Sequence, residues 1–262
     1  MRKFTILFSA LLLAAGALHA QEFGAPSPAG DAGQFTLGGA LSHSSTDYKD
    51  FSGSITSNRL YAEGAYAFTG DWEGYARLGA YAQDGARNSG TGNCYYDAYG
   101  NFICSGNSGN YSTKPFIGAG VRGLFWKREA FAIGMVAQFN WRANSSYAYS
   151  YTTGSNFNTV RVTLRSQFDL AAGPAFQWTT PSKFKVYAGP FAYTTSGTQD
   201  TSITTTNPGG TSSINYSTDY KDKDNVGLFA GIRIPFGRNW SFNAEAQERS
   251  GYVIGAGFSH TF

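Results

Sequence analysis

Apolar side chains occupy every second position over long stretches of this chain, and this period constrains the fold more than any other feature. In FAIGMVAQFNWR, residues 131–142, one face carries Phe, Ile, Met, Ala, Phe and Trp, while the other carries Ala, Gly, Val, Gln, Asn and Arg. A period of two is that of a β-strand. The same pattern predicts strands over residues 34–46, 57–68, 72–84, 114–126, 130–142, 159–178, 184–197, 223–236, 240–249 and 251–262.

The length and number of these stretches favour a membrane barrel. Strands of soluble proteins average about five or six residues, whereas a strand that crosses a membrane needs about 9–11. The last stretch, GYVIGAGFSHTF (251–262), can pair with the first and leave no open edge in lipid. We therefore predict an all-β fold, a closed antiparallel up-and-down transmembrane β-barrel of ten strands.

The start of the chain predicts export. Arg2 and Lys3 precede an apolar run from Phe4 to Leu18, and Ala20 offers a small residue for cleavage. This pattern is that of a secretory signal peptide, and the run is too short for a membrane-anchor helix. The predicted organisation is a signal peptide over residues 1–20, a short periplasmic segment over 21–32 and the barrel over 33–262.

Two kinds of connection join the predicted strands. Four are short, over residues 69–71, 127–130, 179–183 and 237–239, and three are long and polar, over 85–113, 143–158 and 198–222. Short turns face the periplasm in outer-membrane barrels and long loops face outward, so both termini are predicted to be periplasmic. Aromatic residues beside the short turns and at the chain ends predict a periplasmic girdle: Phe35, Phe68, Trp72, Trp126, Phe131, Trp178, Phe184, Phe236, Trp240 and Phe262.

The end of the chain resembles a known signature. A terminal Phe262 on an alternating strand is similar to the C-terminal signature of bacterial outer-membrane β-barrel proteins, and His260 stands where that signature has an apolar or aromatic residue. The resemblance extends as a pattern over residues 33–262 and is to the small, ten-stranded porin-like or opacity-like class. It implies the outer membrane of a Gram-negative bacterium, contact with outer-membrane lipid, and recognition of the last strand by the barrel-assembly machinery.

Charged residues share the inward parity of the predicted strands, since Arg on the lipid face costs about 2–4 kcal/mol at mid-depth. The interior of a ten-stranded barrel is close to the size that side chains fill, so these charges indicate either a filled, ion-paired lumen or a narrow, weakly anion-preferring porin. Glycine and alanine on the inner face leave space for the second alternative. The predicted lumen-facing charges are Arg59, Glu63, Glu73, Arg77, Arg122, Arg142, Arg161, Arg165, Asp169, Lys185, Arg233, Glu245 and Arg249.

Catalysis has little support in the sequence. Ten strands is the strand number of the omptin proteases, whose acidic and Asp–His pairs lie at the outer rim, which makes a rim hydrolase of this type a third hypothesis. Here His43 has outward parity, no Asp-x-His is present near it, and no Gly-x-Ser-x-Gly occurs. No catalytic residue, metal site or cofactor is predicted. The 20 Lys and Arg less Arg2 and Lys3 leave 18, against 17 Asp and Glu, which argues against nucleic acid as a partner.

The long loops carry the remaining functional prediction. Cys94 and Cys104 lie in one polar loop of an exported chain, which predicts a disulfide. Tyrosines follow in the sequence YYDAYG (95–100) and in SYAYSY (146–151), and tyrosine on a rigid loop is good contact material. We interpret the chain as a non-enzymatic barrel that stabilises the envelope and displays loops 85–113, 143–158 and 198–222 for adhesion or complex assembly.

Overall fold

The computed structural model describes residues 23–49, 54–84, 93–96, 102–105, 113–153 and 155–262. The predicted signal peptide and its cleavage after Ala20 lie outside these residues. No helix in the described part has the length and hydropathy that a membrane crossing requires.

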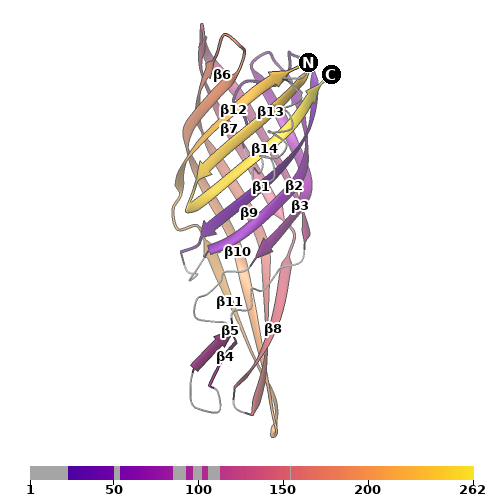
Figure 1. Ribbon diagram of the computed structural model, residues 1–262, viewed down its shortest axis with the longest axis vertical. Helices are drawn as coiled ribbons and strands as arrows, with labels where there is room; N and C mark the ends of the chain where they lie inside the picture. Colours follow the sequence, from indigo (N-terminus) through magenta and orange to yellow (C-terminus); the bar gives the residue numbers. More distant parts are fainter. Residues whose placement is uncertain (1–22, 50–53, 85–92, 97–101, 106–112, 154) are drawn as a thin grey trace, which may run out of the picture.

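Ten long strands form a closed antiparallel barrel, which confirms the predicted fold class (Figure 1). Each strand pairs with its neighbours along the chain, and β10 also pairs with β9. Pairing from Thr36↔Thr261 to Thr46↔Gly251 joins the first strand to the last and closes the ring. The barrel strands are β1 (Phe35–Asp47), β2 (Ser54–Ala67), β3 (Trp72–Asp84), β6 (Lys114–Arg128), β7 (Phe131–Arg142), β9 (Asn156–Thr179), β10 (Lys185–Asn207), β12 (Val226–Phe236), β13 (Trp240–Glu248) and β14 (Gly251–Thr261).

The two ends of the barrel differ. At one end lie the start of β1, the end of β14 and the short connections β2–β3, β6–β7, β9–β10 and β12–β13; we call it the turn end. The other end, the loop end, carries the longer connections and the tight turn at Ser250 and Gly251, whose φ angles are 40° and 135°. This division is the one that the connection lengths predict.

Two of the predicted loops are largely β-structure. β8 (Ser145–Thr153) pairs with β9, and β11 (Gly210–Lys221) pairs with β10, so that β8, β11 and the loop-end parts of β9 (156–165) and β10 (196–207) form an extended sheet. This extended sheet projects beyond the loop end along the long axis of the molecule (Figure 1). Its strands are rich in Thr and Tyr, which favour β-structure. β11 lacks the apolar alternation of a strand with one buried face, whereas β9 keeps it in the buried Val160, Val162 and Leu164.

A short hairpin lies within the predicted loop 85–113. β4 (Asn93–Tyr96) pairs with β5 (Phe102–Ser105), and the backbone register places Cys94 opposite Cys104. The side chains of these strands lie outside the described part of the structure, so the disulfide stays a prediction.

A bulge changes the parity of β9. Ser166 has φ 52°, and the β9–β10 register shifts between Ser196 and Thr198 because β9 carries one extra residue there. Gln167 and Asp169 face the lumen beyond this point, whereas Arg161 and Arg165 are exposed on the outer side. The prediction that Arg161 and Arg165 face the lumen is therefore wrong. It assumes unbroken alternation along β9, and one inserted residue reverses the side on which every later residue lies.

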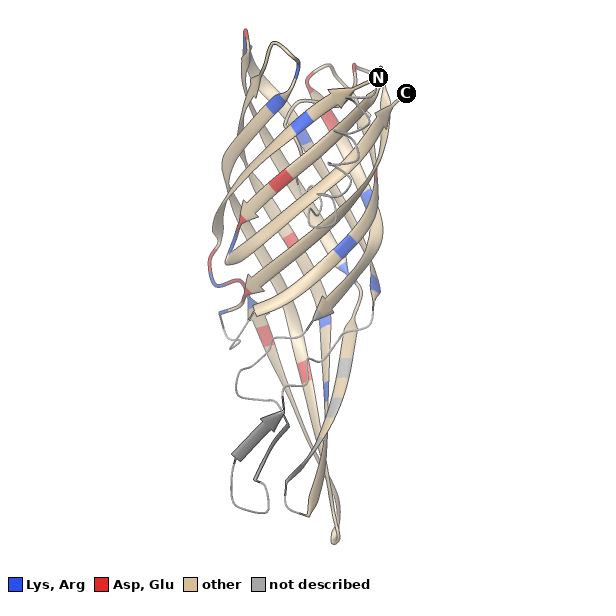
Figure 2. Cartoon of the chain, in the orientation of Figure 1, with Lys and Arg blue, Asp and Glu red and all other residues tan. Residues whose placement is uncertain are grey.

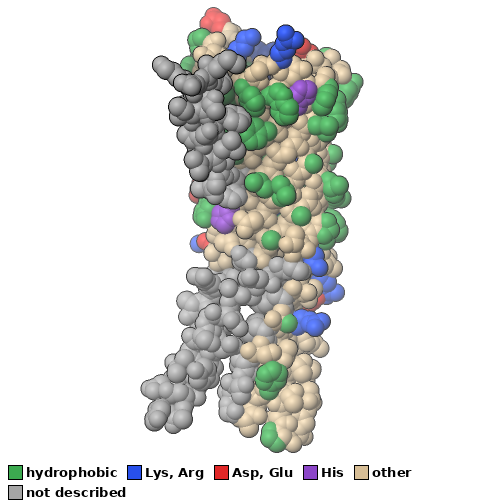
Figure 3. Space-filling view, turned by 45° about the vertical axis from the view of Figure 1, so that its right-hand side comes forward, with side chains coloured by type: hydrophobic (Ala, Val, Ile, Leu, Met, Phe, Trp, Pro, Cys, Tyr) green, Lys and Arg blue, Asp and Glu red, His purple; other side chains and the backbone are tan. Residues whose placement is uncertain are grey.

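The outer wall of the barrel is apolar. Leu60 is 59% exposed and Leu78 65%, and Figure 3 shows hydrophobic side chains along this wall and at the turn end. The predicted girdle residues lie at the turn end, most of them exposed, from Phe184 at 37% to Phe262 at 63%. Trp72 and Phe236 are half-buried. A closed barrel with an apolar belt is the architecture of a small outer-membrane β-barrel protein.

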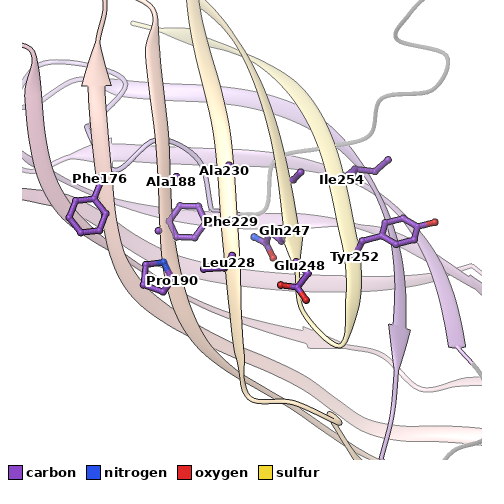
Figure 4. Close-up of a pocket in the computed structure, with 12 residues that line it drawn as sticks. Phe176, Ala188, Pro190, Leu228, Phe229, Ala230, Gln247, Glu248, Tyr252 and Ile254 are labelled. Atoms are coloured by element: carbon purple, nitrogen blue, oxygen red, sulfur yellow. The ribbon is translucent and has the colours of Figure 1, made fainter.

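A hollow of about 650 Å³ interrupts the outer wall (Figure 4). Ala188, Ala230 and Ala246 lie side by side on β10, β12 and β13, because the register pairs Ala188 with Ala230 and Ala230 with Ala246. Phe176 and Leu228 flank this row of small side chains. The hollow therefore lies on the hydrocarbon side of the wall and is separate from the lumen.

Leu78→Arg tests the position of the wall in lipid. We expect this change to lower the free energy of unfolding in lipid vesicles by about 2–4 kcal/mol, because the guanidinium enters hydrocarbon. Ile214→Arg is the matched control: Ile214 on β11 is also 65% exposed but lies in the extended sheet, so its substitution should change stability by no more than about 0.5 kcal/mol. Equal effects in urea titrations of the two variants would contradict the assignment of the wall to the membrane.

Candidate functional site: the filled lumen

Many charged side chains of the barrel strands are buried inside the barrel, and Figure 2 marks the positions of the charged residues along the strands. Most of the predicted lumen charges are buried; Glu63 is 13% exposed, and Lys185 is half-buried at the turn end. They form one cluster toward each end of the lumen. The buried members are Arg59, Glu73, Arg77, Arg122, Arg142, Asp169, Arg233, Glu245 and Arg249.

The N-terminal segment, residues 23–33, occupies the turn end of the lumen. The sequence predicts a short periplasmic segment over 21–32, and the described part of it enters the barrel, with residues 23–28 buried. The Phe23 ring meets Phe191 and Phe229 edge-on, each at 5.0 Å between ring centroids. Phe23, the first described residue of the segment, is thus held in the lumen by contacts between aromatic rings.

Carboxylates of the wall accept the amide protons of this segment. Glu245 Oε1 accepts the Phe23 N–H at 3.0 Å, and Glu245 Oε2 accepts the Gly24 N–H at 2.8 Å. Glu73 Oε2 accepts the Ala29 N–H at 2.9 Å. A carboxylate that receives two peptide N–H groups has its charge stabilised without a cation beside it.

Basic side chains satisfy the segment's oxygens. Arg122 Nη1 donates to the Phe23 carbonyl at 2.8 Å, and Arg233 Nη1 donates to the Ser27 carbonyl at 2.9 Å. Lys185 Nζ contacts the Ser27 hydroxyl at 2.8 Å. The lumen therefore presents acids to the segment's amides and cations to its carbonyls, which is the pattern of a built binding site for this stretch of backbone.

Arg122 also organises the turn-end cluster of wall charges. It pairs with Glu73 through Nε and with Glu63 through Nη2, the latter at 2.9 Å. Arg77 shares Glu63 at 2.8 Å and lies over the ring of Tyr75, 4.5 Å from its centroid. Glu63 and Glu73 are thus each held by at least one guanidinium.

Asp169 is the centre of the loop-end cluster. Arg142 approaches it at 2.7 Å, Arg249 at 3.7 Å and Arg59 at 3.9 Å. The Thr195 hydroxyl donates to the same carboxylate at 2.7 Å. Three guanidinium groups surround one carboxylate in the lumen at this level, beside a cavity of about 10 Å³.

Aromatic rings fill the space that the inner-face glycines leave. A Cβ on Gly120 would come within 2.4 Å of the Tyr75 ring, and a Cβ on Gly231 within 2.4 Å of the Tyr187 ring. The cavity beside Tyr61 and Arg122 measures about 10 Å³, which is the size of one water site. These glycines accommodate rings, and they add no room for a channel.

The turn end is open to solvent as a polar recess of about 530 Å³. Ser27 and Asp31 of the N-terminal segment form one side of it, and Lys127 and Arg238 lie on the other. The N-terminal segment therefore forms part of the wall of this recess.

The third hypothesis, a rim hydrolase, finds no supporting geometry among the described residues. His43 has the outward position that parity predicts, with Nδ1 2.9 Å from Asn58 Oδ1 and Nε2 3.4 Å from the Tyr252 hydroxyl. Asn58 and Tyr252 are both neutral groups, so neither of these two contacts makes the imidazole a stronger base. No group of three or more His, Cys, Asp or Glu suited to a metal ion occurs in the described part of the chain.

Asp222 is a buried carboxylate that the sequence does not reveal. It lies between β11 and β12, beyond the loop end of the barrel, where its backbone bridges to Tyr48 and its carboxylate accepts the Thr195 N–H. Burial raises the pKa of Asp222 to about 6, against the opposing effect of Arg249. In the sequence it belongs to the polar run Asp222–Asp224, which looks like a solvated rim, whereas in the fold Asp222 is buried, as are Tyr48 and Tyr220 close to it.

The N-terminal segment should stabilise the barrel. Deletion of residues 21–30 leaves Glu245, Arg122 and Arg233 without partners that they have in the intact protein, and we expect the free energy of unfolding to fall by about 2–5 kcal/mol. Urea titration of the refolded mature protein in lipid vesicles, followed by tryptophan fluorescence, measures this change. Ser27→Ala keeps every backbone bond and should lower stability by no more than about 1 kcal/mol. Unchanged stability in the deletion variant would show that the segment does not bind in the lumen.

Asp222 predicts a pH dependence. Its pKa is about 6 in the folded protein, against about 3.9 when unfolded, so the folded state holds the proton more tightly. The resulting stabilisation is complete below pH 4 and is lost as the pH rises through about 6, a change of up to about 3 kcal/mol. Asp222→Asn should remove this component from the difference in unfolding free energy between pH 4 and pH 7. Asp224→Asn, at an exposed neighbour, should leave the profile unchanged, and identical profiles for both variants would contradict the prediction.

No protein-family model matches the sequence, and no curated protein matches it. Among solved structures, the chain is similar to the outer membrane protease OmpT from Escherichia coli, at 9% identity over 88% of this chain and 94% of that chain, with a TM-score of 0.41. It is also similar to the translocator domain of the autotransporter NalP from Neisseria meningitidis, at 11% identity over 89% of both chains, with a TM-score of 0.43. A third is Ail, the attachment invasion locus protein of Yersinia pestis, at 9% identity over 88% of this chain and 99% of that chain, with a TM-score of 0.29. Likeness at this level bears on neither substrate nor partner.

Proposed function

We propose that this protein is a non-enzymatic barrel of the Gram-negative outer membrane that strengthens the envelope and displays its loop-end structure outside the cell. In this orientation the turn end and both termini are periplasmic, and the extended sheet is extracellular. The activity that we assign to this protein is adhesion or complex assembly through the extended sheet.

The observation that carries this proposal is the filling of the lumen at two separate levels. The N-terminal segment lies on Glu245, Arg122 and Arg233 toward the turn end. The cluster around Asp169 fills the loop end independently. A conducting porin needs one continuous aqueous path, and side chains and backbone packed at these two levels support the proposal that there is none.

The balance of lumen charge supports the same conclusion. Arg122 and Arg233 each donate to a backbone carbonyl of the segment in addition to a wall group. Their positive charge is therefore engaged by fixed dipoles of the protein, which reduces its ability to concentrate mobile anions.

The extended sheet gives the barrel a surface to display. β9 has 24 residues and β10 has 23, whereas a strand needs only about 9–11 to cross a membrane. The surplus builds a rigid sheet above the membrane, and no lumen function requires it.

Planar-bilayer recording on the refolded, full-length mature protein tests the proposal. We expect no stepwise conductance above the leak of the bilayer at either polarity. The narrow-porin alternative requires steps with an anion preference that decreases in Arg233→Glu, because that charge faces the lumen. Such steps would overturn the proposal. An established porin reconstituted in the same lipid confirms that channels are detectable.

A further inference from the structure

β11 carries an unpartnered edge. On one side it pairs with β10 from Ser196↔Lys221 to Asn207↔Gly210, without a register shift. On its other side, the described residues provide partners only at its base, where Lys49 N–H donates to the Lys221 carbonyl and Tyr48 bridges to Asp222. Residues 210–219 are all exposed. Their outward peptide groups form a template for another strand.

This edge lacks the features that normally protect an edge strand. Residues 210–218, GTSSINYST, include no charged residue and no proline, and no bulge turns the strand away from its neighbour. Short length, charges, prolines or bulges are the usual protections. At the opposite edge of the extended sheet, β4 lies against β8. β11 is thus the edge of this sheet that is suited to pairing.

The sequence of β11 is complementary to itself in the antiparallel direction. A two-fold axis at Asn215 places Ile214 opposite Tyr216 of a second copy, and Tyr216 opposite Ile214 of that copy. These side chains are 65% and 50% exposed in the single chain, and aromatic–β-branched pairs are favourable across antiparallel strands. The same axis places Ser212 opposite Thr218 and Thr211 opposite Asp219, so that no two like charges meet.

We propose that β11 pairs with β11 of a second copy of this protein embedded in an apposed membrane. The inference rests on the proposed function, in which the extended sheet is extracellular. The strands of this sheet run nearly along the long axis of the molecule (Figure 1). A two-fold axis perpendicular to them reverses that long axis, so the two barrels point in opposite directions. Barrels in one membrane all point the same way, and the pairing therefore joins two membranes.

Each β11–β11 contact is one of many that form between two apposed membranes. A single pairing over residues 211–219 is short and needs only modest affinity. Many copies facing each other across two membranes add their contacts, because each pairing raises the effective concentration for the next. The expected activity is homophilic adhesion between cells or vesicles that carry this protein.

Charge exchange across the axis tests the proposal, because position 212 lies opposite position 218 of the partner copy. Full-length protein is reconstituted in two lots of vesicles with donor and acceptor dyes, and their clustering is followed by energy transfer and light scattering. Wild-type vesicles should cluster. Ser212→Lys with Thr218→Lys, or Ser212→Glu with Thr218→Glu, should each reduce clustering at least about tenfold, because like charges face each other twice. Mixing the lysine and glutamate vesicles should restore it.

Matched controls separate pairing from general surface charge. Ser202→Lys with Thr204→Lys, and Ser202→Glu with Thr204→Glu, add the same charges on β10, which is paired on both sides. Vesicles of either control variant should cluster like wild type. Loss of clustering in the β11 variants without restoration on mixing would overturn self-pairing, and so would unchanged clustering of the lysine variant alone. If wild-type vesicles stay dispersed and bilayer recordings show no conductance, only the β11 inference is rejected. If the recordings show stepwise conductance, the proposed function is rejected.

Discussion

Hydrocarbon around the barrel offers no partner to a peptide group or a charge, so each of them has to find one within the same chain. This constraint accounts for the pairing of β1 with β14, which leaves no strand edge in lipid. It also accounts for the inward position of the buried charges in the barrel, since Arg or Lys at mid-depth on the outer wall would destabilise the fold by about 2–4 kcal/mol. The exposed strand β11 of the extended sheet lies beyond this constraint, and there both the apolar alternation and the edge protection disappear.

The N-terminal segment completes the interior that the wall alone leaves unfinished. Among the described residues, Glu245 has no arginine as a hydrogen-bond partner; it accepts from the amides of Phe23 and Gly24, the hydroxyl of Tyr187 and the side-chain amide of Gln247. Arg122 and Arg233 in turn donate to carbonyls of the same segment. A surplus of lumen cations, which from the sequence suggests an anion pore, is therefore better explained as the means of binding a piece of backbone. The same contacts fill the turn end of the lumen and are expected to stabilise the barrel.

Much of the fold follows from the sequence, and the exceptions have specific physical reasons. Period-two alternation predicts the ten barrel strands because hydrocarbon outside and polar groups inside impose it. It misplaces Arg161 and Arg165, since the extra residue at Ser166 reverses the parity of β9. It assigns β8 and β11 to loops; residues 210–219 of β11 are exposed on both faces, and a strand in water carries no apolar alternation. The entry of Phe23 into the lumen and the burial of Asp222 depend on contacts between residues far apart in the chain, and no local pattern records them.

The central claim is that the N-terminal segment is bound inside the lumen, and amide hydrogen exchange measures it most directly. In the mature protein in lipid nanodiscs, the amides of Phe23 and Gly24, which donate to Glu245, should exchange as slowly as amides in the middle of β13 and β14. Exchange of these two amides at the rate of an unstructured peptide, with the strands still protected, would contradict the account.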